Sequence, residues 1–228
     1  APNGDTLWVR RYDGPLNSND QATALVVDDS GNVYVTGESW GSAETYTDFT
    51  TIKYSPNGDT LWVRRYNGPG NYYDHSNDLA VDASGNVYVA GSSYFSSTGW
   101  DYTIIKYAPS GDTLWVRHYN GPGDSTDEVR ALAVDENGNA YVTGSSSGSG
   151  TLSDFATIKY APNGDTLWVR RYNGPGNYYD HANDLAVDDS GNVYVTGSSP
   201  DSVTGQDYTT IKYTPDGDVL WLKRYNGP

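Results

Sequence analysis

The sequence predicts an all-β fold, and three features carry that prediction. Its 21 Tyr and 7 Trp are aromatic residues with a polar end, which suit short, half-buried strands. Its 26 Gly supply turns, whereas strong helix formers are sparse. The pair Leu-Trp recurs every 53 or 54 residues, starting at positions 7, 61, 114, 167 and 220. A fixed period of this length is typical of proteins assembled from one repeated supersecondary unit.

Each period contains four strands in order, as the last copy illustrates. A short apolar segment is followed by an Asp-Asp-Ser-Gly-Asn turn, a Val-rich strand, a variable polar loop, a third strand, a Pro-Asp-Gly turn and the Leu-Trp strand. In the second copy Leu61 and Val63 point to one face of the last strand, and Trp62 and Arg64 to the other. The four strands of the last copy are expected at 183–187, 193–197, 208–213 and 219–225.

A single meander of this size cannot bury both of its faces, so neighbouring copies must stack. Radial stacking predicts a β-propeller of four-stranded antiparallel blades, with the repeated Trp residues as wedges between blades. We expect one domain over residues 1–228 that contains four blades and one surplus outer strand at its N-terminal end. The expected boundaries are 1–15 for the surplus strand and 16–69, 70–122, 123–175 and 176–228 for the blades.

The repeat resembles a known family. Residues 27–37 and 187–197 both read Val-Asp-Asp-Ser-Gly-Asn-Val-Tyr-Val-Thr-Gly, and Ile-Lys-Tyr-x-Pro-x-Gly-Asp and Leu-Trp follow. This pattern is similar to the bacterial beta-propeller repeat, often called seven-bladed, although four repeats are present here. The resemblance implies a propeller fold and an extracellular or cell-surface location. It implies no common activity, because the residues that the family shares are structural.

With the surplus strand the chain has five outer strands, whereas it has four copies of each of the other three strands of a blade. Residues 1–15 match residues 214–228, so the chain opens in the middle of a blade. Either this reflects an arbitrary boundary, or the extra strand pairs with a neighbouring molecule, since an unpaired edge is a template for strand addition.

A second period spans two blades. The loops before the second and fourth blades share the sequence Gly-Asn-Tyr-Tyr-Asp-His, whereas the other two loops lack it. Flat aromatic faces beside amides and carboxylates suit glycans, and packing over a blade interface is the alternative. The candidate ligand-binding residues are Tyr72, Tyr73, His75, Tyr178, Tyr179 and His181.

Four aspartates recur eight residues before the hairpin aspartates. They are Asp20, Asp74, Asp127 and Asp180. If the first strand of each blade lines a central channel, these carboxylates form a ring that attracts hard cations. Calcium is the candidate ion. The alternative is that each aspartate caps its own loop by accepting backbone N–H bonds. The hairpin at 28–32 lacks the spaced ligands of a calcium loop and is expected to be a turn.

Charge and composition narrow the partners. The formal net charge of −15 repels phosphate backbones and anionic lipid, so neither nucleic acid binding nor membrane insertion is expected. No cysteine is present, which excludes thiolate catalysis and Cys-ligated zinc. No cofactor other than calcium is indicated.

The near-identical blades are expected to leave no asymmetric catalytic pocket, and no nucleophile elbow is present. The sequence therefore predicts a non-catalytic, secreted structural protein that self-associates into a surface array or filament. The alternative is a propeller module that binds a glycan or a protein through its Tyr-rich loops.

Overall fold

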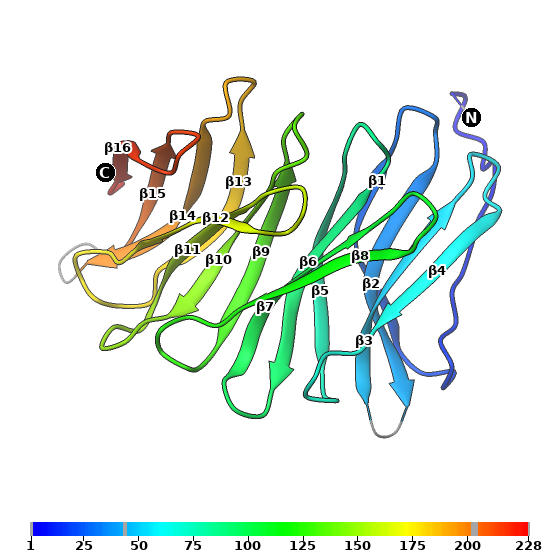
Figure 1. The fold of residues 1–228 in the computed structure, drawn as a ribbon, viewed down its shortest axis with the longest axis horizontal. Coiled ribbons are helices and arrows are strands. Elements are labelled where there is room, and N and C mark those ends of the chain that lie inside the picture. The colour runs from blue at the N-terminus through cyan, green and yellow to red at the C-terminus, as the bar shows by residue number, and fades with distance from the viewer. Residues whose placement is uncertain (1, 43–44, 202–204, 228) are drawn as a thin grey trace.

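The computed structural model describes residues 2–42, 45–201 and 205–227, and these contain sixteen strands and no helix. The strands form four antiparallel four-stranded sheets, each a meander of consecutive strands, which confirms the predicted all-β blades (Figure 1). The first blade holds β1 (Asp20–Val27), β2 (Val33–Ser42), β3 (Tyr46–Tyr54) and β4 (Thr60–Tyr66). The second holds β5 (Asp74–Val81), β6 (Val87–Phe95), β7 (Gly99–Tyr107) and β8 (Thr113–Tyr119). The third holds β9 (Asp127–Val134), β10 (Ala140–Ser147), β11 (Ser153–Tyr160) and β12 (Thr166–Tyr172). The fourth holds β13 (His181–Val187), β14 (Val193–Asp201), β15 (Gly205–Tyr213) and β16 (Val219–Tyr225).

The hairpin between the first two strands of each blade is organised by its leading aspartate. Asp28 accepts hydrogen bonds from the backbone N–H groups of Ser30 and Asn32 and from the Asn32 side chain, at 2.8–2.9 Å. Tyr34, on the next strand, donates its hydroxyl to the same carboxylate at 3.0 Å. Gly31 takes the positive φ of 79° that closes the turn. The expected turn is therefore confirmed, and the carboxylate is occupied by its own hairpin.

A β-bulge interrupts the first strand of every blade. In the second blade the pairing with β6 moves from Ser76 directly to Asp78, so Asn77 has no partner across the ladder. The same shift leaves Thr23, Arg130 and Asn183 without cross-strand partners in the other blades. Bulges turn a side chain away from the pleat, and these four lie on the innermost strands.

The blades stand side by side in a row, with the inner strands β1, β5, β9 and β13 in order and the first and fourth blades at opposite ends (Figure 1). Apolar clusters fill the three interfaces between neighbouring blades. The repeated tryptophans serve as the expected wedges: Trp62, Trp115 and Trp168 are only 7–8% exposed. Each donates its indole N–H to a proline carbonyl in the next blade, at 3.0–3.1 Å.

The N-terminal segment 5–12 repeats these contacts without belonging to a sheet. Trp8 donates to the carbonyl of Pro56 at 3.0 Å, and the Arg10 guanidinium donates to the carbonyl of Gly58 at 2.6 Å. The segment thus occupies, against the first blade, the place of a preceding blade's outer strand.

The arginines that follow the tryptophans make two kinds of contact. The first arginine of each pair donates to a glycine carbonyl of the next blade, as Arg64 does to Gly111 at 2.6 Å. In the first, third and fourth blades the second arginine pairs with a buried aspartate of its own blade, as Arg171 does with Asp154 at 2.9 Å. A search of the described residues finds no helix long and apolar enough to cross a bilayer.

Candidate functional site

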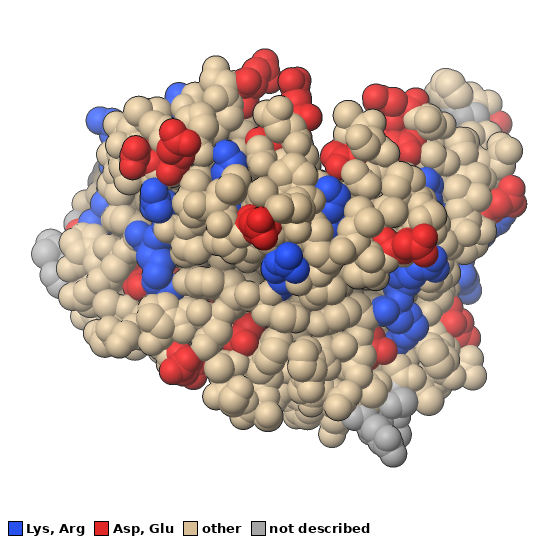
Figure 2. Space-filling model, viewed as in Figure 1, with Lys and Arg blue, Asp and Glu red and all other residues tan. Residues whose placement is uncertain are grey.

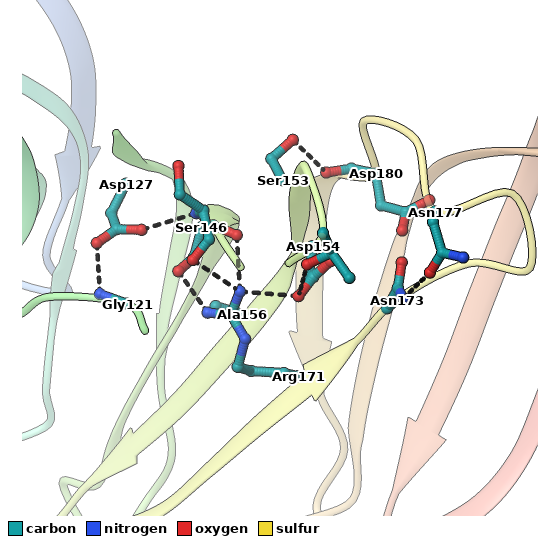
Figure 3. Close-up of polar contacts among 12 residues, drawn as sticks. Gly121, Asp127, Ser146, Ser153, Asp154, Ala156, Arg171, Asn173, Asn177 and Asp180 are labelled. Atoms are coloured by element: carbon teal, nitrogen blue, oxygen red, sulfur yellow. Dashed lines mark hydrogen bonds and ion pairs between the residues drawn. The ribbon is translucent and has the colours of Figure 1, made fainter. Parts of the chain in front are cut away.

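The four aspartates predicted to bind metal are each engaged by the loop that precedes them. Each accepts a hydrogen bond from the backbone N–H of a glycine six residues earlier, at 2.6–2.8 Å. The pairs are Asp20 with Gly14, Asp74 with Gly68, Asp127 with Gly121, and Asp180 with Gly174. Figure 3 shows the third pair beside the Arg171–Asp154 ion pair.

The structure does not bring these four carboxylates together. Their geometry is that of the loop-capping alternative, in which each carboxylate satisfies backbone donors of its own turn. Over the ranges that the structure describes, no group of three or more His, Cys, Asp or Glu side chains is arranged to hold a metal ion.

The first predicted tyrosine pair belongs to a larger group, here called the tyrosine cluster, where the first and second blades meet. Its neighbouring ring centroids lie 4.6–6.1 Å apart. The members are Trp40, Tyr46, Tyr72, Tyr73 and Tyr94. Tyr46 adopts a φ of 54°, an unusual backbone conformation for a bulky residue, and it packs between Tyr72 and Tyr73.

A stack of aromatic rings leads from this cluster to a pocket. The Tyr73 ring lies parallel to His75 at 6.0 Å, and His75 stacks on Trp100 at 4.9 Å with an angle of 19° between the rings. His75 Nδ1 is in direct contact with the Glu38 carboxylate, which comes from β2 of the first blade. The imidazole is therefore held between a carboxylate and an indole.

The pocket, here called the inner pocket, lies between the second and third blades and has a volume of about 420 Å³. Its lining comes from β5, β6, β7 and β9 and consists of His75, Asn77, Ser92, Trp100, Glu128, Val129 and Arg130. Asn77 and Arg130 are the bulge residues of their strands, so the ladder defect places their side chains at the site. Arg130 is paired with Glu128 at 2.8 Å.

The inner pocket therefore combines an aromatic platform with a carboxylate, a guanidinium, an amide and an imidazole. Polar groups of both signs around a flat apolar surface can hydrogen-bond to a polyhydroxylated ligand while its ring stacks on the indole. The Glu38–His75 contact also places a basic group beside an imidazole, the arrangement that general acid–base chemistry uses.

The second predicted set occupies a separate, related pocket between the third and fourth blades. Tyr179 and His181 stack at 6.3 Å with an angle of 2° between rings, and His181 bonds to Ser145 Oγ at 2.9 Å. These residues line a pocket of about 520 Å³ together with Glu128. Among the described residues no ring contact joins the two tyrosine sets. Tyr178, in the loop before the fourth blade, is half exposed. Glu128 is common to both pockets, so the two sites are adjacent along the inner strands.

Sequence reasoning missed Glu38, Trp100, Glu128 and Arg130. Their positions differ between the four copies, and aligning the copies reveals this. Glu38 stands where the other blades have Ser92, Ser145 and Ser198. Trp100 stands where they have Thr47, Ser153 and Gln206. Residues that break the repeat were the available signal for a site that only some blades form.

Acidic side chains also lie at the turns between the first two strands of the blades. Figure 2 shows acidic side chains at the upper edge of the viewed face, over these turns, and further acidic side chains scattered across the rest of that face. Two grooves between neighbouring turns are lined by these residues, one by Asp28, Asp29 and Asp82 and the other by Asp135, Glu136, Asp188 and Asp189.

Solved structures with a similar fold include enzymes. A polysaccharide lyase, Uly1, aligns with a TM-score of 0.51 and 14% identity over 90% of this chain and 49% of its own. A putative gluconolactonase aligns with a TM-score of 0.47 and 16% identity over 91% of this chain and 64% of its own. A gluconolactonase from Xanthomonas campestris aligns with a TM-score of 0.39 and 13% identity over 90% of this chain and 89% of its own. The chain thus spans about half to two thirds of the length of the first two.

The expectation that the chain is not an enzyme is wrong as an inference from the fold, because a solved structure with a similar fold is a polysaccharide lyase. Its physical premise also fails, since residues from variable positions of three blades meet around the inner pocket despite the near-identical repeats. At this level of identity the likeness concerns the fold.

The search of curated proteins found no match to this chain. A family model described as a beta-propeller repeat does match, at residues 8–42, 61–96, 114–150 and 167–200. The four matches cover more than half of the chain, and each runs from one Leu-Trp segment through the first two strands of the following blade. This chain belongs to the beta-propeller repeat family.

Proposed function

We propose that this chain is a saccharide-binding β-propeller whose binding site is the inner pocket, with the stacked His75–Trp100 pair as its platform. The single observation that carries the proposal is that stack, at 4.9 Å, opening onto Asn77, Glu128 and Arg130. A pyranose ring presents C–H groups on its face and hydroxyls around its rim. It therefore matches an aromatic floor surrounded by donors and acceptors.

The charges favour neutral or basic saccharides over polyanionic ones. Among the described residues that line the pocket, Arg130 is the one lysine or arginine, and it pairs with Glu128. Glu38 adds a further carboxylate behind His75. The whole chain has a net charge of −15, which repels sulfated or uronate-rich polymers at long range.

The adjacent pocket supports a ligand longer than one sugar. The Tyr179–His181 stack offers a second platform, and Glu128 lines both pockets. Stacked sheets lie on the order of 10 Å apart, so platforms on successive blade interfaces suit a chain of several sugar units.

A glycan array that contains neutral, basic and acidic glycans, followed by titration calorimetry with the strongest ligand, tests the proposal. Trp100→Gln is the informative variant, because Gln206 occupies the same place in the fourth blade and the fold accommodates it. Loss of the aromatic platform is expected to weaken binding about tenfold or more. Glu136→Ser, which removes a carboxylate from a hairpin turn, is the control and is expected to bind as the unmodified protein does.

Binding to no glycan, or affinity that Trp100→Gln leaves unchanged, contradicts the proposal. Glu38→Ser tests the Glu38–His75 contact, and serine is the residue of the other three blades at that position. If the contact orients the imidazole ring for binding, this variant weakens the affinity for the glycan.

A further inference from the structure

The outer face of the fourth blade carries the aromatic residues that are buried at every internal interface. At each interface the earlier blade contributes a tyrosine, a second aromatic ring and a tryptophan. The internal sets are Tyr34, Phe49 and Trp62, then Tyr88, Tyr102 and Trp115, then Tyr141, Phe155 and Trp168. All nine side chains are at most 8% exposed.

The matching residues of the fourth blade are Tyr194, Tyr208 and Trp221, at the end of the row. Tyr208 is 72% exposed and Trp221 is 37% exposed, whereas Tyr102 and Trp115 are 0% and 8% exposed. These residues line a blade face with nothing packed against it in the described part of the molecule.

The first blade carries the opposite half of the same interface, and it contains a cavity of about 350 Å³. The apolar part of the lining includes Leu25, Val33, Val35, Ile52 and Tyr54. The equivalent residues of the second blade are Leu79, Val87, Val89, Ile105 and Tyr107, and these pack against the aromatic set of the first blade. The cavity is therefore the place that a preceding blade's aromatic rings fill elsewhere.

The N-terminal segment supplies only the tryptophan of such a set. The Trp8 ring lies 6.0 Å from Tyr54, close to the 6.2 Å between Trp62 and Tyr107 at the first internal interface. No described residue of the segment 5–12 fills the positions of the other two rings, which explains why a cavity remains beside Trp8.

The two ends of the row also carry the acceptor and the donor of one hydrogen bond that forms between two neighbouring blades. Asp78 on the second blade accepts the backbone N–H of Leu132 on the third, at 2.8 Å. By register, Asp184 on the fourth blade corresponds to Asp78, and Leu25 on the first blade corresponds to Leu132. The other two interfaces have Ala24 and Ala131 at the aspartate position, so contact between a fourth blade and a first blade continues the alternation.

We propose that the fourth blade of one molecule docks onto the first blade of a second copy, with Tyr194 and Tyr208 in the cavity and Trp221 in place of Trp8. A second copy is the occupant because the two faces are complementary halves of an interface that the chain itself forms three times. Contact between two different faces is head-to-tail, so two molecules close into a ring, or more molecules continue as an open chain.

Sedimentation velocity over a concentration series tests the proposal on the full chain. The unmodified protein is expected to associate reversibly. Tyr208→Ser is expected to weaken association about tenfold or more, as expected for loss of an aromatic anchor at an interface centre. Because Tyr208 is mostly exposed in the single molecule, the melting temperature of the Tyr208→Ser protein should not fall. Tyr178→Ser, which changes another exposed tyrosine outside the face and outside both pocket linings, is the matched control and leaves association unchanged.

Trp8→Ala is expected to change association in the opposite direction. Trp8 occupies the site that Trp221 must enter, so its removal is expected to strengthen association. Because the chain has no cysteine, single cysteines report the geometry with a short thiol crosslinker. A mixture of Tyr208→Cys and Val35→Cys proteins should crosslink, and Tyr208→Cys alone should not.

A protein that stays monomeric at every concentration overturns the proposal. So does association that Tyr208→Ser does not weaken, or efficient crosslinking of Tyr208→Cys with itself, which indicates a symmetric contact. If Tyr208→Ser fails to fold, Asp184→Ala replaces it, with the same expected direction.

Discussion

Asp101 in the second blade lies where the other three blades have a buried ion pair. Asp48, Asp154 and Asp207 each accept a bond from an arginine at 2.9 Å. In the second blade, His118 takes the place of that arginine, and its side chain bonds to Thr103 at 2.9 Å instead. Burial without that arginine raises the pKa of Asp101 to about 6.

His118→Arg is therefore expected to stabilise the fold. The surroundings that hold Arg65 in the first blade, a threonine and a tyrosine hydroxyl, recur around His118 as Thr103 and Tyr66. We expect a gain of about 1–2 kcal/mol in the free energy of unfolding, because a buried carboxylate acquires a charged hydrogen-bond partner. Urea denaturation measures it.

A double-mutant cycle with Asp101→Asn assigns the gain to the pair. In the Asp101→Asn background the arginine should lose most of its benefit. A stabilisation of equal size in both backgrounds, or a lower stability of His118→Arg, contradicts this interpretation.

At the scale of the element, the hairpin aspartates hold the blades' first turns. Asp135 accepts two backbone N–H groups, the Asn139 side chain and the Tyr141 hydroxyl, at 2.7–2.9 Å. Desolvation raises the pKa of Asp135, but the bonds from Asn139 and Tyr141 outweigh it and leave the pKa below its usual value. Asp135→Ala is expected to cost about 2–3 kcal/mol, since several donors lose a charged acceptor.

Thermal unfolding followed by circular dichroism measures that cost. Glu136→Ala, the neighbouring carboxylate in the same turn, serves as the matched control and should change stability by less than about 0.5 kcal/mol. Equal effects of the two substitutions would show that net charge, and not the turn network, sets the stability.

The hairpins could be predicted from the sequence because their signals are local: the Asp-x-x-Gly-Asn pattern and the alternation of the flanking strands. The bulges could not. The skipped residue differs in chemistry between blades, being Thr23, Asn77, Arg130 or Asn183, and its position depends on how the strand pairs with its partner. Because two of these residues line the inner pocket, that part of the site was hidden from sequence reasoning.

For the whole molecule, stability is expected to be greatest in mildly acidic solution. Desolvation raises the pKa of Asp74 and of Asp101 to about 6, so the folded state holds these protons more tightly than the unfolded state, where the pKa is near 3.8. Their contribution is fully present below about pH 4 and is lost as the pH rises through 6. The hairpin carboxylates have lowered pKa values, so their contribution is lost as the pH falls below 3.8.

Urea denaturation between pH 3 and pH 8 checks this expectation. Stability should rise by about 2 kcal/mol for each of the two buried carboxyls as the pH falls from 7 to about 4.5. Asp101→Asn removes one of these titrations, so its curve should be flatter between pH 5 and 7. A maximum above pH 7, or a slope that Asp101→Asn leaves unchanged, contradicts the assignment.

The repeat period gave the four blades and their strand order, because a 53-residue meander has one way to bury both faces. It could not give the pocket. Glu38, His75 and Glu128 come from three different blades, and only the spacing between stacked blades brings them together. Their meeting depends on the blade arrangement, whereas the repeat pattern describes each blade by itself.

Successive blades alternate between alanine and aspartate at the position of Asp78, and this alternation bears on how such a protein gains or loses repeats in evolution. Every blade interface uses the same aromatic rings, so a gene that gains or loses copies of the repeat by unequal recombination still encodes matching faces. Adding one 53-residue copy, however, would place two aspartate-bearing or two alanine-bearing interfaces in succession, whereas adding a pair preserves their order. Duplication in pairs is therefore the change that leaves every buried backbone donor at these interfaces with its acceptor.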